Sequence, residues 1–192
     1  MQELPNWFKN DGEDNFASVL VPNFAGKPIK ALQIGAYSGD ASYWLAENVL
    51  THQDSYLWDV DTWEGSDEPV HKALDWKSVE SIYTDKLWFH IQLMKVRPFK
   101  GTSDEFFKQN TETFDFIYID GDHTSYGVLK DAVNAFESLK VGGILAFDDY
   151  QWSAGLGQIK EPKLAIDSFY KVYEDRVDLL VDGYQRWFRR SR

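Results

Sequence analysis

One stretch, residues 114–150, constrains the fold more than any other part of the chain. It reads FDFIYIDGDHTSYGVLKDAVNAFESLKVGGILAFDDY. Apart from Asp115, the run at 114–119 is aromatic and β-branched, which is typical of a strand buried on both faces. An apolar helical stripe follows over 124–140, and GILAF at 143–147 is a second apolar strand. Two parallel strands joined by a helix form a right-handed βαβ unit, so this stretch predicts an open α/β sheet.

Both strands of this unit end in acidic residues. Asp120 follows the first strand, with His123 three positions later, and Asp148 and Asp149 follow the second. The carboxyl ends of neighbouring parallel strands meet at one edge of the sheet, where open α/β sheets bind ligands. Like charges at that edge repel, and a bound cation or polar ligand would relieve the repulsion. Three carboxylates suit a hard cation such as Mg²⁺.

The rest of the chain continues the alternation of strands and helices. Helix 124–140 is predicted to end at Gly142-Gly143, because glycine admits positive φ. The turn Asp182-Gly183 is a strong hairpin signal. Further strands are predicted at 29–34, 54–60, 96–100, 177–181 and 184–188, and further helices at 40–50, within 66–95, after Thr102 or Ser103, and from Pro162. The predicted fold is therefore Rossmann-like and doubly wound, an α/β fold with a mostly parallel seven-stranded sheet and a C-terminal antiparallel hairpin.

We expect one domain over residues 1–192. Residues 1–28 would be an N-terminal lead-in with an early helix, docked through Phe16 and Leu20, and residues 29–188 the Rossmann-like core. The polar, glycine-containing loop 151–161 is long enough to act as a lid over the acidic edge.

Composition excludes several classes of protein. The formal net charge of −11 argues against a broad interface with a nucleic-acid backbone, so no nucleic-acid partner is expected. No apolar run approaches the ~20 residues of a membrane span, so no membrane partner is expected either. The absence of cysteine removes disulfides, thiolate metal sites and a cysteine nucleophile. The N-terminus lacks a signal-peptide pattern, which makes the cytoplasm the expected compartment.

A glycine-rich turn follows the first predicted strand. Between Gly35 and Gly39 it has the spacing G-x-x-x-G, which differs from the dinucleotide pattern G-x-G-x-x-G. Such a turn lets a ligand approach the backbone and the amides of the next helix. Asp61 lies at the end of the second strand, where an acid accepts hydrogen bonds from ribose hydroxyls, and Asp59 is the alternative.

Each of these residues also has an ordinary structural explanation. A single strand-end acid commonly caps a helix or meets water, and Asp122 and Asp131 are assigned such roles. His71 and His90 are expected at the surface or the edge of the core. The functional interpretation depends on three acids and a histidine falling at adjacent strand ends.

Taken together, these motifs resemble the class I S-adenosylmethionine-dependent methyltransferases. The similarity covers about residues 29–188 and is most specific in D-F-I-Y-I-D-G-D-H-x-x-Y and L-K-V-G-G-I-L-A-F-D-D-Y. These motifs are similar to the small-molecule O-methyltransferase family that includes macrolide-sugar and cephamycin-type methyltransferases. I-G-A-Y-S-G-D-A-S, at 34–42, resembles the first motif of that family, and D-T-W-E-G, at 61–65, its second.

The resemblance implies a role for each matching position. His123 matches the general base of the macrolide-sugar enzymes, and Asp61 would hold the ribose. The residues around the methionine end of the cofactor would be Gly35, Tyr37, Ser38, Gly39 and Ser42, and those near the nucleoside Thr62, Trp63, Thr102 and Ser103. The divalent cation, expected to be Mg²⁺, would be bound by Asp120, Asp148 and Asp149, with Asp120 also beside the cofactor.

The implied function is S-adenosylmethionine-dependent O-methylation of a hydroxylated small molecule or sugar. Gln33 departs from the family, which usually has an acid at this position to hold the cofactor ammonium group. An alternative is therefore a cofactor-binding regulatory or interaction protein on the same fold, without methyl transfer. A nucleic-acid methyltransferase is disfavoured by the acidic charge and by the absence of an N/D-P-P-Y/W motif. The high aromatic content, 16%, leaves room for a homo-oligomer.

Overall fold

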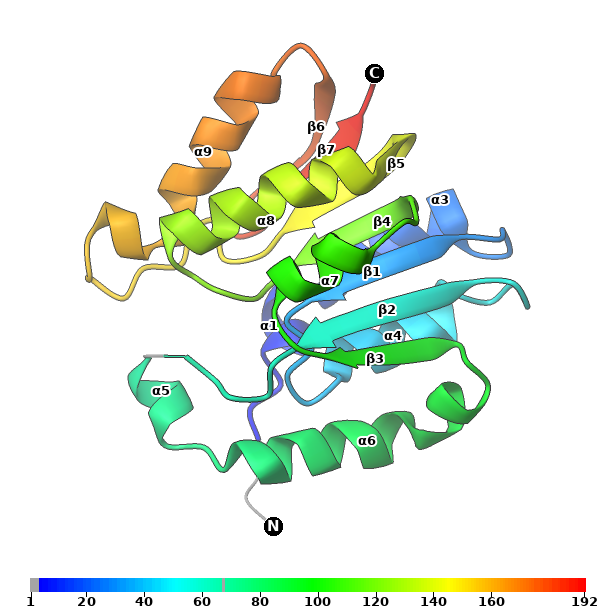
Figure 1. The fold of residues 1–192 in the computed structure, drawn as a ribbon. Helices are drawn as coiled ribbons and strands as arrows, with labels where there is room; N and C mark the ends of the chain where they lie inside the picture. Colours follow the sequence, from blue (N-terminus) through cyan, green and yellow to red (C-terminus); the bar gives the residue numbers. More distant parts are fainter. Residues whose placement is uncertain (1–3, 67) are drawn as a thin grey trace.

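The computed structural model, which describes residues 4–66 and 68–192, shows a seven-stranded sheet between two layers of helices (Figure 1). The strand order is β3-β2-β1-β4-β5-β7-β6. Strands β1 to β5 are parallel, β7 is antiparallel to β5, and β6 is antiparallel to β7. The strands are β1 Lys30–Ile34, β2 Tyr56–Asp61, β3 Val96–Lys100, β4 Phe114–Ile119, β5 Leu139–Phe147, β6 Val177–Asp182 and β7 Arg186–Arg190. The predicted fold class is confirmed, including the C-terminal hairpin.

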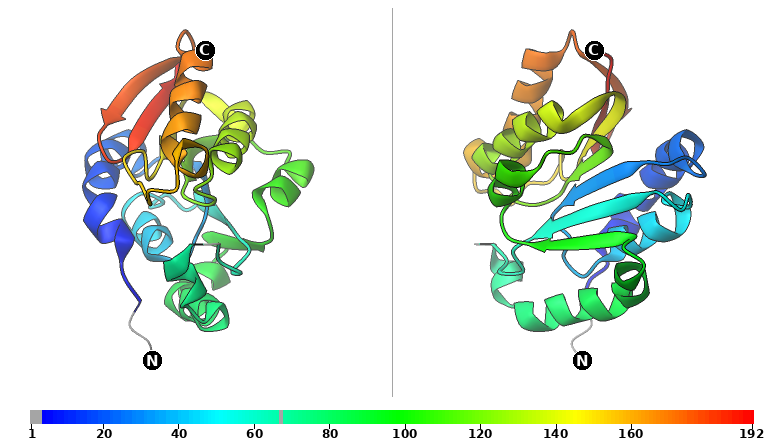
Figure 2. Two further views of the ribbon diagram at one scale, coloured as in Figure 1. Left: turned by 90° about the vertical axis from the view of Figure 1, so that its left-hand side faces the viewer. Right: turned by 45° about the vertical axis from the view of Figure 1, so that its right-hand side comes forward.

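Helices cover both faces of this sheet (Figures 1 and 2). One face carries the N-terminal segment, α4 and α6, and the other carries α7, α8 and α9. The helices of the core are α4 Asp40–Asn48, α5 Pro69–Lys72, α6 Trp76–Gln92, α7 Ser103–Gln109, α8 Ser125–Ser138 and α9 Pro162–Tyr173, and a 3-10 turn spans Gln158–Lys160. Among the described residues, no helix has the length and apolar character needed to cross a membrane.

The central strands are apolar on both sides because each side meets a different helix layer. In β4, Phe116 and Tyr118 join the cluster under α4 and α6, whereas Ile117 and Ile119 join the cluster under α7, α8 and α9. All four side chains are at most 3% exposed. This two-sided burial explains why 114–119 has no polar alternation.

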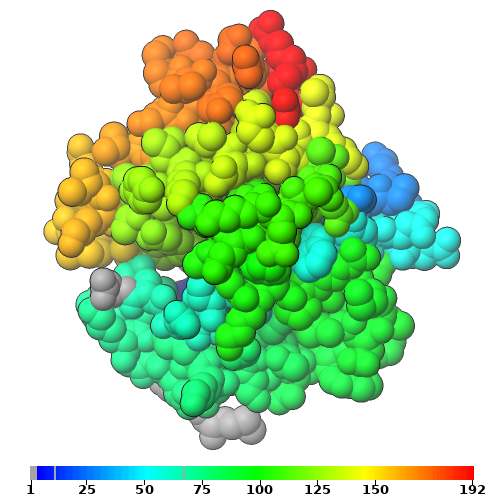
Figure 3. Space-filling model, viewed as in Figure 1, coloured from blue at the N-terminus to red at the C-terminus, as the bar shows by residue number. Residues whose placement is uncertain are grey.

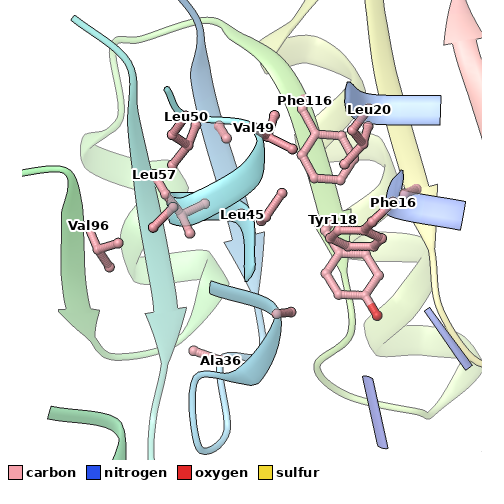
Figure 4. Packing of buried hydrophobic residues seen from close by; sticks show 14 of the residues in the cluster. Phe16, Leu20, Ala36, Leu45, Val49, Leu50, Leu57, Val96, Phe116 and Tyr118 are labelled. Carbon is pink, nitrogen blue, oxygen red and sulfur yellow. The ribbon is translucent and has the colours of Figure 1, made fainter. Parts of the chain in front are cut away.

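The N-terminal segment packs against the sheet as a series of short helical turns. These are α1 Trp7–Asp11, α2 Glu13–Asn15, a π-helical turn Phe16–Leu20 and α3 Val21–Phe24. Phe16 and Leu20 are fully buried. The Phe16 ring lies 5.0 Å from Tyr118 and 5.7 Å from Phe116, in edge-on contacts (Figure 4). The expected docking of the lead-in through Phe16 and Leu20 is therefore confirmed.

The predicted end of the helix at 124–140 is wrong. Helix α8 stops at Ser138, and β5 begins directly at Leu139, so Gly142-Gly143 lie inside the strand. Gly142 has a φ of +86°, and the pairing of β4 with β5 shifts register between Phe114 and Phe116. The glycines thus accommodate an irregularity in the sheet, which glycine does as readily as ending a helix.

Candidate functional site

The turn after β1 brings the ends of β1 and β4 together. Gly35 has a φ of +87°, and a Cβ at this position would lie 1.8 Å from the carbonyl oxygen of Asp120. Any side chain would clash with that backbone, so glycine is required for the close approach. Gly39, with a φ of +81°, is the N-cap residue of α4. The glycine turn and Asp120 therefore form one continuous surface at the carboxyl edge of the sheet.

Asp61 holds this turn in shape. Its Oδ2 accepts hydrogen bonds from the amides of Ala36 (2.8 Å) and Tyr37 (2.9 Å), and its Oδ1 accepts one from the amide of Trp63 (2.7 Å). The carboxylate therefore lies beside the glycine turn, as a ribose-binding acid would. Asp59 is fully buried in β2 and accepts a hydrogen bond from the Tyr83 hydroxyl, which removes it from the edge.

The polar side chains predicted at the methionine end mostly stabilise the turn itself. Ser38, 1% exposed, donates to Asp40 at 2.8 Å. Ser42 is fully buried, and its hydroxyl lies 3.5 Å from the amide oxygen of Gln33. Gln33 donates its amide to the carbonyl of Gly35 at 2.8 Å. The neutral Gln33 side chain thus stabilises the turn by donating to the Gly35 carbonyl. A carboxylate at position 33 has no N–H to donate and could not make this bond.

The residues predicted near the nucleoside lie at the ends of β2 and β3. Trp63 is 5% exposed, and its indole N–H donates to the carbonyl of Tyr37 at 3.0 Å, whereas Thr62 beside it is partly exposed. The amide of Gly101 donates to the carbonyl of Asp61, which joins the two strand ends. The start of α7 therefore lies next to Asp61.

Thr102 and Ser103 have structural partners at this position. Of the two predicted N-cap candidates, Thr102 is the N-cap of α7, and it forms a capping box with Glu105. Ser103 donates to Asp131 at 2.5 Å. Burial raises the pKa of Asp131 to about 6. The hydroxyls of Thr102 and Ser103 are thus engaged, and the amides of Gly101 and Thr102 also have hydrogen-bond partners.

A cavity of about 40 Å³ lies between the glycine turn and the N-terminal helix. Its walls include Gly35, Tyr37, Gln33 and Asp120. The Tyr37 hydroxyl is buried and has no hydrogen-bond partner. Burial raises the pKa of Tyr37 to about 12, so this hydroxyl stays protonated and able to donate. An unpaired buried donor at this position indicates that a polar ligand group belongs there.

The acidic edge gathers two of the three predicted metal ligands with His123. Ligand atoms of Asp120, His123 and Asp149 lie within 4.8 Å of one another. The imidazole Nε2 is 3.0 Å from Asp149 Oδ2 and 4.0 Å from Asp120 Oδ1. Burial, together with the charges of Asp148 and Asp149, raises the pKa of Asp120 well above its ordinary value. We call Asp120, His123 and Asp149 the acidic pole.

The third predicted ligand, Asp148, is oriented away from this pole. Its Oδ2 accepts a hydrogen bond from the Tyr118 hydroxyl at 2.5 Å, and its Oδ1 accepts hydrogen bonds from the Gln185 amide and the Asp149 backbone. Burial raises the pKa of Asp148 to about 6. Asp148 would have to leave these partners before it could bind a cation directly.

His123 is held between two carboxylates from distant parts of the chain. Its Nδ1 lies 2.9 Å from Glu68 at ion-pair distance but without the geometry of a hydrogen bond, and its Nε2 lies 3.0 Å from Asp149. Burial lowers the pKa of His123, but contacts with Asp149 and Glu68 outweigh burial and raise that pKa to about 11. The Trp152 ring, from the predicted lid loop, lies 5.0 Å from the imidazole. Glu68 was not predicted from the sequence, because only its acidity, shared with its neighbours, marks it.

Backbone strain is concentrated at the same edge. Within residues 4–66 and 68–192, the non-glycine residues with positive φ are Tyr37, Trp63, Asp149 and Met94. The first three follow β1, β2 and β5, with φ values of 47°, 50° and 56°. Such conformations cost about 1–3 kcal/mol each and are retained mainly at functional sites. The strain therefore points to the same location as the acidic pole and the cavity.

Comparison with known proteins identifies the family of the domain that contains this edge. The family model described as "Methyltransferase domain" matches residues 32–150, which include the glycine turn, Asp61 and the acidic pole. The chain belongs to this family. This membership confirms the prediction of an S-adenosylmethionine-dependent methyltransferase. No curated protein matches the chain.

Solved structures share the fold at low sequence identity. A candidate rRNA methylase from Clostridium thermocellum is 14% identical, with a TM-score of 0.67 and coverage of 98% of each chain. The O-methyltransferase from Bacillus cereus, in complex with S-adenosylhomocysteine, is 15% identical (TM-score 0.61; 92% of this chain and 88% of that chain). TomG from Streptomyces achromogenes, an O-methyltransferase of tomaymycin synthesis in complex with S-adenosylmethionine, is 13% identical (TM-score 0.61; 86% and 74%).

Proposed function

We propose that this protein transfers the methyl group of S-adenosylmethionine to a hydroxyl of a small molecule or sugar, with the help of a divalent cation. The observation that carries the proposal is the acidic pole, two carboxylates and an imidazole within 4.8 Å of one another, next to the cavity at the glycine turn. The O-methyltransferases from Bacillus cereus and Streptomyces achromogenes, which share the fold, support the same reaction class.

The residues at the glycine turn fit the proposed cofactor. The unpaired Tyr37 hydroxyl and the close approach of Gly35 to Asp120 leave polar groups facing a narrow cavity, which suits the amino-acid end of S-adenosylmethionine. Asp61 would accept the ribose hydroxyls, and Thr62, Trp63, Thr102 and Ser103 would lie along the nucleoside. Because Gln33 adds no charge, the cofactor ammonium group would depend on Asp120 for an opposite charge.

The acidic pole fits a divalent cation. Asp120 and Asp149 offer carboxylate oxygens, which both Mg²⁺ and Mn²⁺ accept as ligands. Two carboxylates this close repel unless a positive charge lies between them, and His123 supplies that charge in the structure. Asp148 remains in the proposed ligand set, but it would bind the cation only after leaving its present partners, Tyr118 and Gln185.

The proposed mechanism assigns the acceptor proton to His123. When bound, a divalent cation lowers the pKa of a hydroxyl group, and the sulfonium cofactor supplies the methyl group. With their charge neutralised by the cation, Asp120 and Asp149 would hold the imidazole proton less firmly, which would lower the pKa of His123. Neutral His123 would then be able to accept the acceptor's proton at Nε2. Glu68 would fix the ring through Nδ1, and Trp152 would help exclude water.

The test is methyl transfer itself. Purified protein with isotopically labelled S-adenosylmethionine and Mg²⁺ or Mn²⁺ is offered a panel of vicinal diols, phenols and sugars, and products are read by mass spectrometry. We expect a labelled methyl ether that disappears with EDTA and with Asp149→Ala. The matched control is Asp122→Asn, an exposed acid of the same turn. Cofactor binding without product from any acceptor would favour the regulatory alternative.

A further inference from the structure

We infer that helix α1 forms the outer wall of the cofactor pocket and that Trp7 is a cofactor-contacting residue, an inference that rests on the proposed function. Trp7 lines the cavity whose inner wall is made by Gly35 and Asp120. No motif of the sequence points to Trp7, which lies nearly thirty positions before the glycine turn. Its assignment comes from the packing of α1 alone.

Helix α1 is fixed at both of its sides. Asn6 caps the helix by accepting a hydrogen bond from the Lys9 amide, and its own amide donates to Asp40 at 3.2 Å. Asp40 is the first residue of α4, directly after the glycine turn. Phe8 packs edge-on against the buried Phe16, with ring centroids 4.9 Å apart. These contacts hold Trp7 at the turn, so its position there is determined by the fold.

The Trp7 ring lies over the glycine turn. Its centroid is 4.7 Å from the Tyr37 ring and 5.9 Å from the His71 ring. Trp7 is 38% exposed, which leaves part of the ring uncovered. The space-filling view shows a hollow between the α5 region and the 150–160 loop, with the dark blue of the N-terminal segment at its floor (Figure 3). Trp7 thus lines the cavity at the glycine turn with part of its ring open to solvent.

The cavity at the glycine turn is too small for the cofactor, so one of its walls must move when the cofactor binds. A volume of about 40 Å³ holds only one or two small groups, far less than the amino-acid end of S-adenosylmethionine. The inner wall is formed by strand ends that are fixed in the sheet. The outer wall is a single turn of helix with an aromatic side chain. The partly exposed Trp7 side chain therefore rotates outward on its fixed helix when the cofactor enters and then packs on the methylene chain of the cofactor, with the buried, unpaired Tyr37 hydroxyl donating to the polar end.

This contact would be shared by cofactor and product. The methylene chain is the same in S-adenosylmethionine and S-adenosylhomocysteine, so loss of Trp7 should weaken both equally. Removing an aromatic side chain that covers a ligand typically raises Kd by about 10- to 100-fold. Phenylalanine keeps an aromatic face of similar reach, so Trp7→Phe should retain most of the affinity. Trp88, 59% exposed on α6, provides a matched tryptophan away from the site.

Calorimetric titration of S-adenosylhomocysteine into the protein of residues 1–192 tests the inference without an acceptor. We expect Kd to rise about tenfold or more in Trp7→Ala, to change less than threefold in Trp7→Phe, and to stay unchanged in Trp88→Ala. Asn6→Ala, which loosens α1 and leaves the indole in place, should give an intermediate value. It also serves as the informative variant should Trp7→Ala fail to fold, which thermal unfolding would reveal.

The outcomes separate this inference from the proposed function. Equal affinities of wild type, Trp7→Ala and Asn6→Ala would overturn the role of α1 and leave the methyltransferase proposal intact. Absence of binding by the wild type would overturn the proposed function, and the inference with it. A loss of affinity in Trp88→Ala as large as in Trp7→Ala would also overturn the inference, since it would reflect general destabilisation.

Discussion

Replacing Asp59 with asparagine is predicted to stabilise the protein at neutral and alkaline pH. Asp59 is fully buried in β2, where its Oδ2 accepts a hydrogen bond of 2.7 Å from the Tyr83 hydroxyl and its Oδ1 has no partner. Burial raises the pKa of Asp59 to about 7. The folded state therefore binds this proton more tightly than the unfolded chain does, and ionisation at higher pH opposes folding.

The magnitude follows from the size of this pKa change. An aspartate in an unfolded chain has a pKa near 4, and each pKa unit corresponds to about 1.4 kcal/mol, so ionised Asp59 costs up to about 4 kcal/mol. The asparagine oxygen keeps the bond from Tyr83, but an amide N–H without a partner costs about 1–3 kcal/mol. The net gain at pH 8 is therefore about 2 kcal/mol. By the same arithmetic the variant is less stable than the wild type by about 2 kcal/mol below pH 4, where the wild-type carboxyl is protonated in both states and only the cost of the amide remains. The difference crosses zero between about pH 5 and 6 and reaches its full favourable value above about pH 7.

Urea unfolding of wild type and Asp59→Asn at pH 5, 6.5 and 8 measures this difference. Tyr83→Phe is the matched control, because it removes the donor to the carboxylate and should destabilise the wild type most at pH 8. The assignment of Asp59 as a buried acid that ionises with difficulty would be refuted by either of two results. One is equal stability of Asp59→Asn and wild type across this range. The other is a stability difference, variant minus wild type, that falls between pH 5 and pH 8.

Three further predictions test the construction of the site. Gly35→Ala should abolish binding of S-adenosylhomocysteine, because its Cβ would lie 1.8 Å from the Asp120 carbonyl oxygen; calorimetry checks this, with Gly183→Ala, whose Cβ meets no neighbour within 4 Å, as control. Glu68→Gln should lower the pKa of His123 from about 11, since it removes a carboxylate 2.9 Å from Nδ1; an unchanged ring titration by NMR would exclude that contact. Thr102→Ala should reduce the free energy of unfolding by about 1 kcal/mol through loss of the capping box, and no change on urea titration would argue against the cap.

The sequence predicted the features that depend on neighbouring residues. The run at 114–119 predicts a strand buried on both faces because it offers no polar face, and the hydroxyls of Thr102 and Ser103 predict a helix N-cap at one of the two, which proves to be Thr102. The glycine turn was recognisable because few other residues permit its backbone. The helix end predicted at Gly142-Gly143 was wrong, because a helix end and a strand irregularity both require the same conformational freedom.

Side-chain orientation depends on partners far away in the chain and could not be predicted. Asp148 faces inward because Tyr118 on β4 and Gln185 beside β7 supply its donors. Glu68 reaches His123 across more than fifty positions. Trp7 lies at the glycine turn only because Phe8 and its neighbours dock on the sheet. Tertiary contacts of this kind leave no periodic signal in the sequence.

The most direct test of the central claim is a titration of the protein with Mn²⁺, with the free ion followed by electron paramagnetic resonance. The acidic pole should bind one ion per chain, and this site should be lost in Asp120→Asn and in Asp149→Asn but kept in Asp122→Asn. S-adenosylhomocysteine in excess should leave the count at one. Absence of a site in the wild type, or a site that survives both pole variants, would contradict the account of how this edge of the sheet directs methyl transfer.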